Sequence, residues 1–487
     1  MAKWELNLSL LRSGNSPLFE RLAWAISEDI RSGRLENGKR LPGSRTLARS
    51  LGIHRNTVLA AYGELEAQGW VDTIPSRGTF VSEGLPQIRR PASAPTADGG
   101  STAGYSVDEP PLPAISPRWP PSVITLRGGM PDLRLIPSEQ LARAYRRVVR
   151  RRGGTLLGYA DPQGHGPLRE ALCDMLRSTR GLPVGPDDIL VTRGSQMALF
   201  LAAKALLSPG DGVAIEGLGY PPAWDALRMA GATLFPVPVD SGGLVVEALE
   251  ELLERQELRA VYLTPHHQYP TMAVLSAPRR LRLLELASKY RFAILEDDYD
   301  NEFHYAGSPV LPIASADEGG SVVYIGTLSK VLAPGLRLGY LVAPRTVVRS
   351  CTSYRTIVDR QGDQAVEAAV AELLEDGMVQ RHVRRMRRTY LSRRDALVAE
   401  LNSKLNGVLE FELPAGGLSL WSRVVPPVDL DRWLEESVKR GAAFGLGQRY
   451  RFDAEKVPFV RLGFAEHSPE ELELGVARMA EGLALLK

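Results

Sequence analysis

The clearest chemical signal in the sequence is a lysine followed, seven residues later, by an arginine. Lys330 closes the run Gly-Thr-Leu-Ser-Lys, which comes directly after an apolar, strand-like segment, and Arg337 lies just beyond it. A lysine amine among small hydroxyl residues is suited to forming a Schiff base with pyridoxal phosphate, whose phosphate needs hydroxyl and guanidinium donors. We therefore predict amine chemistry at Lys330, with Thr327, Ser329 and Arg337 holding the phosphate.

Pyridoxal phosphate also needs a carboxylate beside its ring nitrogen and a donor to its phenolic oxygen. Asp297 follows the strand-like segment 293–296, where ligands collect outside the carboxyl ends of parallel strands, and Tyr299 lies two residues further on. We predict that Asp297 keeps the ring nitrogen protonated and that Tyr299 reaches the phenolic oxygen. Four neighbouring carboxylates compete for these roles, and a solvated acidic loop is the alternative interpretation: Glu296, Asp298, Asp300 and Glu302.

Two further segments could contact such a cofactor. Gly194-Ser195-Gln196 opens an apolar helix, so its free amides and the helix dipole could bind a phosphate. Tyr220 is placed to approach or stack on the ring, and a polar turn at residues 264–271 carries two adjacent histidines. These histidines are more typical of a turn or of packing. The seven histidines of the chain show no metal-site spacing, so we expect no metal.

The elements that must position these residues alternate between strands and helices. Short apolar runs separated by helical patterns occur at residues 188–192, 213–215, 260–263 and 292–295. Buried strands that alternate with helices form a mainly parallel sheet with helices on its faces. The sequence therefore predicts an α/β fold for the larger part of the chain.

The first eighty residues are organised differently. A helical stripe covers residues 17–30, a turn leads to a short helix at 46–51, and a further helix opens at His54. Two short strands around a turn at 75–78 then form a hairpin, with Arg77 at its tip. This order predicts a helix-turn-helix with a wing, although a packing module with a solvated basic face is the alternative. The polar residues that open the second helix of the motif are of types that reach base edges and phosphates: Arg55, Asn56 and Thr57.

Composition divides the chain and bears on its location. The net charge is +2, so only the local excess of arginine and lysine at residues 31–55 favours contact with nucleic-acid phosphates. Prolines, glycines and small residues are frequent at 83–120, which predicts a linker between a DNA-binding domain at 13–82 and a cofactor-binding domain at 121–487. Two distant cysteines, the lack of a secretory leader and the lack of a spanning apolar run predict a cytoplasmic protein with no membrane partner. A second basic run, residues 381–394, fits either another DNA surface or a solvated helix face.

The N-terminal motifs resemble those of a known family. Residues 15–82 resemble the winged helix-turn-helix of GntR-type regulators, through Leu-Pro-x-Ser-Arg, Leu-Ala-x-x-Leu-Gly, Arg-x-Thr-Val-x-x-Ala-Tyr and a Gly-Thr-Phe-Val wing. The resemblance implies double-stranded DNA as a partner. It also implies phosphate or base contacts by Arg45, Arg55 and Arg77.

The remaining motifs resemble fold type I aminotransferases over residues 123–487. This resemblance implies pyridoxal 5'-phosphate as cofactor, a homodimer, and a smaller C-terminal α+β lobe at roughly 360–487. It further implies that Tyr159 reaches the phosphate bound by the neighbouring subunit and that Arg461 binds a ligand carboxylate. The family turn Asn-Pro-Thr-Gly is replaced by Tyr-Pro-Thr-Met, so we expect Gln268 or His267 to substitute for the missing amide.

Across almost its whole length the chain resembles the MocR subfamily of GntR-type regulators. This resemblance implies a transcription regulator whose aminotransferase-like domain senses an amino acid, an amine or the cofactor itself, with at most residual aminotransferase chemistry. Two alternatives stay open. One is a competent aminotransferase with a localising DNA-binding module, and the other is a cofactor-free DNA-binding scaffold, with which the set of Lys330, Asp297 and Arg337 conflicts.

Overall fold

The structure is a computed structural model that describes residues 16–86, 105–107, 119–305, 310–425 and 427–486. The chain divides between Pro110 and Pro111 into two compact units. Most of the predicted linker lies outside the described residues, so its bounds stay a prediction. Among the residues that the structure describes, no helix combines the length and the apolar character needed to cross a membrane.

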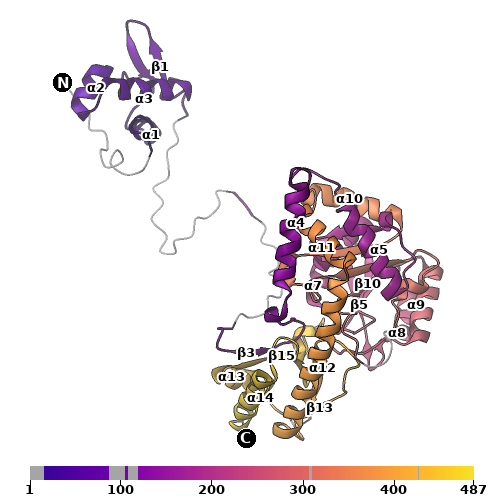
Figure 1. Ribbon diagram of the computed structural model, residues 1–487. Coiled ribbons are helices and arrows are strands. Elements are labelled where there is room, and N and C mark those ends of the chain that lie inside the picture. Colours follow the sequence, from indigo (N-terminus) through magenta and orange to yellow (C-terminus); the bar gives the residue numbers. More distant parts are fainter. Residues whose placement is uncertain (1–15, 87–104, 108–118, 306–309, 426, 487) are drawn as a thin grey trace. The chain divides into compact units, whose positions relative to one another are not determined.

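The described part of the first unit is a three-helix module with a β-hairpin (Figure 1). Its elements are α1 (Leu18–Arg31), α2 (Ser44–Leu51), α3 (Arg55–Ala67), β1 (Val71–Ile74) and β2 (Gly78–Val81). The apolar stripe of α1, including Leu22 and Ile26, is buried in one core with Val58 and Leu65 of α3. Gly52 ends α2 at a φ of 66°, in the left-handed region that glycine adopts without strain. The predicted helix-turn-helix and wing are confirmed.

The second unit is built on a seven-stranded sheet with the order β4-β12-β11-β10-β9-β5-β6. These strands are β4 (Ile189–Thr192), β5 (Gly212–Glu216), β6 (Thr233–Val237), β9 (Leu258–Leu263), β10 (Ala293–Asp298), β11 (Val322–Thr327) and β12 (Gly339–Val342). All neighbouring pairs are parallel except those of β12, which runs antiparallel to both β11 and β4. The predicted mainly parallel sheet is confirmed, while β12 is a strand that the sequence analysis did not identify.

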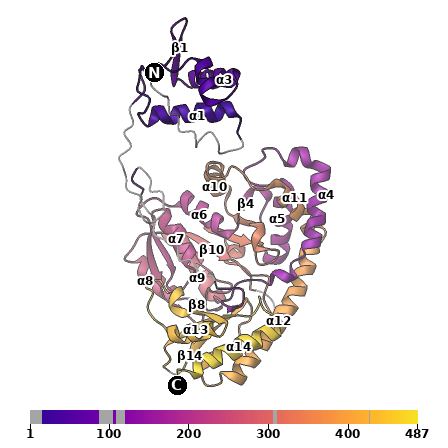
Figure 2. The ribbon, with the colours of Figure 1, turned by 90° about the vertical axis from the view of Figure 1, so that its left-hand side faces the viewer.

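Helices cover both faces of this sheet (Figures 1 and 2). They are α4 (Ser138–Leu156), α5 (Gly166–Arg180), α6 (Ser195–Leu206), α7 (Pro221–Met229), α8 (Val246–Leu253), α9 (Ala277–Tyr290), α10 (Arg345–Val358) and α11 (Gln364–Glu375). Leu190 shares a core with residues of α6, α7 and α10, whereas its neighbours Ile189 and Val191 share another with α4, α5 and α11. Because strand side chains alternate between faces, these cores lie on opposite sides of the sheet. A third core joins α8 and α9 to the sheet, and β7 (Val239–Asp240) pairs with β8 (Gly243–Leu244) beside it.

A second, five-stranded sheet forms a smaller lobe with the order β13-β14-β16-β15-β3. Its elements are β3 (Ile124–Leu126), α12 (Met378–Lys404), β13 (Leu409–Phe411), β14 (Ser419–Val424), α13 (Leu430–Lys439), β15 (Ala442–Leu446), β16 (Phe459–Gly463) and α14 (Pro469–Ala484). The long helix α12 joins the two lobes, since Met378 lies in the core of the large lobe and Met386 in that of the small one (Figure 1). The small lobe therefore begins within α12, later than about residue 360, and it also takes in β3 from the start of the unit.

Candidate cofactor and nucleic-acid sites

The carboxyl ends of the parallel strands surround a cavity of about 260 Å³. It is lined by Gly129, Met130, Ser195, Gln196, Tyr220, Tyr262, Thr264, Tyr269, Asp297, Tyr299, Thr327, Ser329, Lys330, Pro334 and Arg337. Nine of the residues predicted to bind the cofactor are in this set, although they come from segments up to about 140 residues apart. The sheet brings them together because its parallel strands end at one edge.

Lys330 enters the cavity from the loop that follows β11, three residues after the strand ends. The strand can pass close to its antiparallel neighbour because residue 326 is glycine: a Cβ there would lie 2.3 Å from the ring of Tyr340. Burial and, secondarily, the charge of Arg461 lower the pKa of Lys330 to about 8. At pH 7.5 roughly a quarter of such amines are neutral, against about one in a thousand for an ordinary lysine. Lys330 is therefore a far better nucleophile than a surface lysine.

Asp297 occupies the end of β10 and is almost fully buried. Its Oδ2 accepts a hydrogen bond of 2.9 Å from the hydroxyl of Tyr262, while its Oδ1 has no partner among the described residues. Burial raises the pKa of this carboxyl to about 7. An unpartnered buried carboxylate oxygen is costly unless a donor is brought to it. Asp297 is thus prepared for a cationic or protonated donor inside the cavity.

The other carboxylates of the acidic segment are engaged elsewhere. Glu296 accepts hydrogen bonds from the amides of Ile313 and Ala314. Asp298 accepts from the hydroxyl of Tyr324, and Asp300 faces His267. Glu302 pairs with Arg180 at 2.6 Å. Among these five acids only Asp297 lines the cavity, so the geometry separates it from its competitors.

An anion cup closes one end of the cavity. It combines the N-terminus of α6, at Ser195 and Gln196, with the hydroxyls of Thr327 and Ser329 and the guanidinium of Arg337. Residue 194 must be glycine, since a Cβ there would lie 2.7 Å from Nη2 of Arg337 and its φ is 81°. Helix amides, hydroxyls and a guanidinium are the donors that phosphate requires.

Three predicted contacts differ in their placement. Tyr220 lines the cavity, with its ring edge-on to Tyr269 at a centroid distance of 5.2 Å. Tyr299 also lines it, but its hydroxyl donates a 3.0 Å hydrogen bond to the backbone oxygen of His267. Gln268 does not line the cavity, because its side-chain amide donates to the oxygens of Leu218 and Tyr269 at 2.7 Å each. Neither Gln268 nor the buried His267 lines the cavity, so their role in place of the missing amide stays a prediction.

Arg461 is fully buried next to the cavity without lining it. Its guanidinium lies 4.2 Å from the ring centre of Tyr269, and its Nε donates a 3.0 Å hydrogen bond to Ser419. Gly128 and Gly129 leave room for it, because a Cβ at residue 128 would lie 3.5 Å from its Cζ and 2.7 Å from Ser419. The ring of Tyr269 therefore lies between Arg461 and the cavity that contains Lys330.

Tyr159 lies outside its own chain's cavity and is 83% exposed. The guanidinium of Arg360 lies 4.4 Å from its ring centre. The contact of Tyr159 with the phosphate of a neighbouring subunit stays a prediction.

These observations together fit pyridoxal phosphate. The cavity offers a nucleophilic amine, an anion cup of several donors and a buried carboxylate oxygen without a partner. The three features match the aldehyde, the phosphate and the ring nitrogen of the cofactor. Sequence reasoning missed Tyr262, whose only signal was a tyrosine on the strand that pairs with β10. It also missed Gly129 and Met130, which come from a loop without a recognisable motif.

In the first unit, the predicted DNA-contacting residues come from α2, the start of α3 and the turn of the hairpin. Arg45, Arg55, Asn56 and Arg77 are exposed, and Thr57 is half-buried. Nε of Arg55 donates a 3.3 Å hydrogen bond to Ser44 of α2, which ties the two helices together. None of the three arginines forms an ion pair with another described residue. Their charges are therefore available to an external anion.

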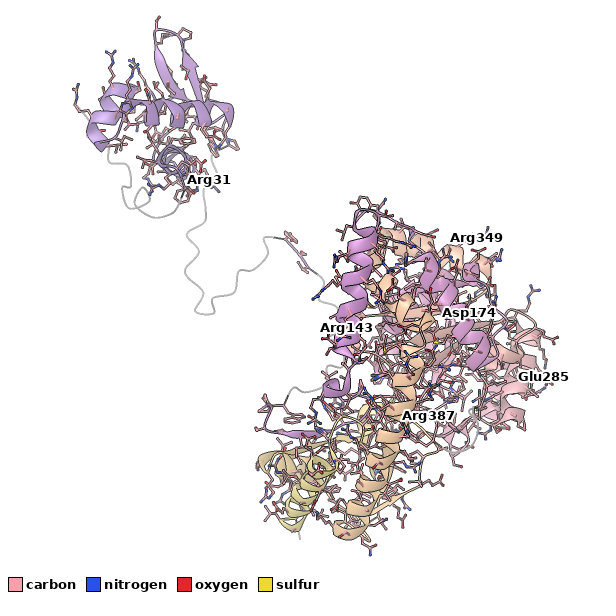
Figure 3. The ribbon with its side chains drawn as sticks, viewed as in Figure 1. Arg31, Arg143, Asp174, Glu285, Arg349 and Arg387 are labelled. Atoms are coloured by element: carbon pink, nitrogen blue, oxygen red, sulfur yellow. The ribbon has the colours of Figure 1, made fainter. Side chains whose placement is uncertain are left out.

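The second basic run lies on α12, where Figure 3 labels Arg387. Arg393 is buried and contacts Asp132 at 2.8 Å, and the buried Arg394 donates to the oxygen of Pro414. Arg387 donates to the oxygen of His304. These three arginines are engaged by neighbouring segments of the second unit. The other four are exposed, so a solvated helix face or a DNA surface stays a prediction for that part of the run: Arg381, Arg384, Arg385 and Arg388.

Comparisons with known proteins match both parts of the chain. Residues 123–479 match the family described as aminotransferase class I and II, and residues 18–81 match the bacterial regulatory proteins of the gntR family. The probable rhizopine catabolism regulatory protein MocR of Rhizobium meliloti is 30% identical, over 99% of this chain and 96% of its own length. The HTH-type transcriptional regulator TauR of Rhodobacter capsulatus is 33% identical, over 97% of this chain and 98% of its own.

Two of the matching enzymes cover about three quarters of the chain. Aromatic-amino-acid aminotransferase 1 of Thermococcus litoralis is 32% identical over 74% of this chain and 87% of its own length. The crystal structure of a multiple substrate aminotransferase from Thermococcus profundus superposes with a TM-score of 0.71 at 30% identity, covering 75% of this chain and 92% of that one.

Proposed function

Since the chain belongs to the MocR subfamily of gntR-family regulators with an aminotransferase class I and II domain, we propose that it is a pyridoxal-phosphate-dependent transcription regulator. One observation carries the proposal. The chain combines an exposed, unpaired arginine surface on a helix-turn-helix with a cavity that fits the cofactor. Full-length similarity to MocR and TauR, against partial similarity to enzymes, supports regulation over metabolism.

Within the cavity, the cup of Ser195, Gln196, Thr327, Ser329 and Arg337 would hold the phosphate. Nζ of Lys330 would attach the aldehyde carbon, and Oδ1 of Asp297 would accept a hydrogen bond from the protonated ring nitrogen. When bound, pyridoxal phosphate supplies an electrophilic carbon that reacts with primary amines and a ring that accepts electrons.

The chain's own groups would then recognise a ligand that bears an amine. When its amine is free, Lys330 would carry a proton at Nζ for much of the time near neutral pH, because its pKa is about 8. Arg461, backed by Ser419 and Tyr269, would bind the carboxylate of an amino acid. Arg461 lies on β16 of the small lobe, so a carboxylate held there would pull that lobe toward the large one.

This closure is the element that would connect ligand and DNA. A ligand that binds the closed arrangement more tightly than the open one shifts the population toward it. In a homodimer, Tyr159 of the partner subunit would contact the phosphate. Closure of one subunit would then affect both subunits and the DNA-binding units attached to them. The effector class is an amino acid, an amine or pyridoxal phosphate itself.

A paired titration tests the proposal. The purified protein is titrated with candidate amino acids while its visible absorbance is followed, and operator binding is measured at the same ligand levels and a stated salt concentration. The proposal predicts that one ligand changes the absorbance and the DNA affinity with the same midpoint. Absorbance changes that leave DNA affinity constant for every ligand would reject the coupling.

A second candidate function is full transamination. The observation that favours it is the complete cavity, in which Lys330, Asp297 and Arg337 are all present. A steady-state assay with amino donors and keto acids separates the two functions, because a regulator converts at most one cofactor equivalent per site.

A further inference from the structure

Three buried histidines from two distant segments meet behind the cofactor cavity. His266 and His267 lie in the turn after β9, and His304 follows the acidic segment after β10. Their exposed fractions are 2%, 1% and 5%. One ring nitrogen from each lies within 4.8 Å of the other two. Spacing along the sequence gave no indication of this cluster, because about 40 residues separate its two parts.

The hydrogen bonding of this cluster is incomplete. Neither ring nitrogen of His266 has a partner among the described residues, and Nε2 of His267 has none either. Buried polar atoms are normally satisfied, and each such exception needs an explanation. A neutral imidazole has one ring nitrogen with a free lone pair, and that nitrogen can bind a metal ion.

His267 is also backed by a carboxylate. Its Nδ1 lies 2.7 Å from Oδ1 of Asp300, which directs the free Nε2 away from that contact. A carboxylate behind an imidazole is the usual second neighbour of a metal-bound histidine, since it fixes the ring and its tautomer. Residue 416 is glycine where the backbone passes this ring: a Cβ there would lie 2.2 Å from Nε2.

The rings are packed closely enough to converge. The centroids of His266 and His267 are 4.4 Å apart, and each lies 5.9 Å from the centroid of His304. The charges around the cluster include Asp298 and Asp300 as well as Arg180 and Arg280. The negative charges of the two aspartates offset part of the arginine charge. Each aspartate also keeps one oxygen without a partner among the described residues.

We propose that His266, His267 and His304 form a binding site for one divalent transition-metal ion, with Zn²⁺ as the favoured ion. Neutral imidazole nitrogens suit zinc and its neighbours rather than calcium or magnesium, which prefer oxygen. Three nitrogens supply three of the four tetrahedral positions and leave the fourth to water. The rings close on the ion by small side-chain rotations, because their nitrogens are already within 4.8 Å.

The site has a route to the cofactor cavity. The backbone oxygen of His267 accepts the hydrogen bond of Tyr299, which lines the cavity. A bound ion would fix the turn at residues 264–271 against the segment that begins at Asp300. We therefore expect metal binding to stabilise the aminotransferase-like unit, because a ligand that binds only the folded state raises the free energy of unfolding.

The test uses the full-length, tag-free protein after treatment with a chelator and desalting. Zn²⁺ is added in competition with a chromophoric chelator, and the thermal midpoint is recorded with and without the ion. The wild type is expected to bind one equivalent per chain and to unfold at a higher temperature. Asp300→Asn should weaken the affinity about 10- to 100-fold, and His266→Ser and His304→Gln should weaken it further. His165→Asn, at a half-buried histidine outside the cluster, is the matched control and should bind like the wild type.

Cobalt substitution keeps the test decisive if a variant fails to fold. Co²⁺ bound by three imidazoles in tetrahedral geometry gives intense bands at longer wavelength than the cofactor, and the wild type should show them at one equivalent. Stoichiometric Zn²⁺ uptake with these bands supports the site. Absence of uptake by the wild type, absence of the bands, or equal uptake by folded His304→Gln protein would overturn it.

Discussion

The hydroxyl of Tyr262 donates a 2.9 Å hydrogen bond to Oδ2 of Asp297 and leaves Oδ1 of the same carboxylate without a partner among the described residues. The two residues lie on the neighbouring parallel strands β9 and β10. One oxygen is therefore fixed by the protein, and the other is left without a partner on a residue that lines the same cavity as Lys330. This pairing sets the direction in which Asp297 can act.

The first prediction concerns this pair. Asp297→Asn removes the acceptor for a protonated ring nitrogen and should weaken pyridoxal phosphate binding about 10- to 100-fold, because hydrogen bonds to charged groups contribute about 1.5–3 kcal/mol. Tyr262→Phe removes only the hydrogen bond that positions Asp297, and it should weaken pyridoxal phosphate binding about tenfold or less. Absorbance titration of cofactor-free protein measures both, with the exposed Asp187→Asn as control. Unchanged affinity in Asp297→Asn would remove Asp297 from the cofactor site.

A second prediction follows from the raised pKa of Asp297, which is about 7. A buried acid whose pKa is raised favours the folded state below its unfolded pKa, and this contribution is lost as the pH rises to about 7. Between pH 4 and 7 the cofactor-free wild type should lose stability relative to Asp297→Asn, by up to about 1.4 kcal/mol per pH unit. Unfolding midpoints in urea across this range measure the difference. Parallel pH profiles for the two proteins would contradict it.

Much of the fold was predictable because its signals are local. Apolar runs gave β4, β5, β9 and β10 to within a few residues, and the helical stripe gave α1. The strand β12 (Gly339–Val342) was not predicted because no α-helix separates it from β11, so it departs from the alternation of strands and helices. The participation of β3 in the small sheet was equally hidden, since it depends on a parallel pairing of Ala442 with Ile124 across more than 300 residues.

The residues of the candidate site also divide into those with a local sequence signal and those without one. Lys330, Asp297 and Arg337 could be predicted because each follows a strand or a short motif. Gln268 does not line the cavity, and sequence does not reveal that its amide donates to the backbone oxygens of Leu218 and Tyr269. Tyr262 and the histidine cluster depend on neighbours in space, so no spacing in the sequence indicated them.

The third prediction concerns the anion cup. Arg337→Ala should weaken pyridoxal phosphate binding about 10- to 100-fold, since a charge-assisted contact to phosphate is lost, while pyridoxal without the phosphate should bind both proteins equally. Arg345→Ala is the control, because Arg345 is exposed and pairs with Asp188 outside the cavity. If pyridoxal binding fell as much as that of the phosphate ester, Arg337 would not be acting on the phosphate.

The fourth prediction concerns the DNA-reading surface. Arg55→Ala should weaken operator binding and, if Arg55 contacts a phosphate, lower the slope of log affinity against log salt by about 0.9. Arg31→Ala is the control, since Arg31 ends α1 and is paired with Glu28 at 2.6 Å. Titrations by fluorescence anisotropy at several salt concentrations give both values. Equal affinity of Arg55→Ala and wild type would exclude Arg55 from the interface.

The fifth prediction concerns the exposed Tyr159. Neither Tyr159→Ala nor Lys330→Ala alone should form an intact site, but a mixed dimer should contain one, provided that the tyrosine acts on the partner subunit. Random mixing of equal amounts should then restore about one site in four. Cofactor binding at a level that only intact sites reach measures the recovery. No recovery in verified mixed dimers would place Tyr159 outside the partner's site.

The most direct measurement is borohydride reduction of the protein loaded with pyridoxal phosphate, followed by proteolysis and peptide mass mapping. The account predicts one pyridoxyl adduct per chain, on the peptide that contains Lys330, and none on that peptide in Lys330→Ala. A wild-type protein whose Lys330 peptide stays unmodified, or whose adducts scatter over the surface lysines, would contradict it.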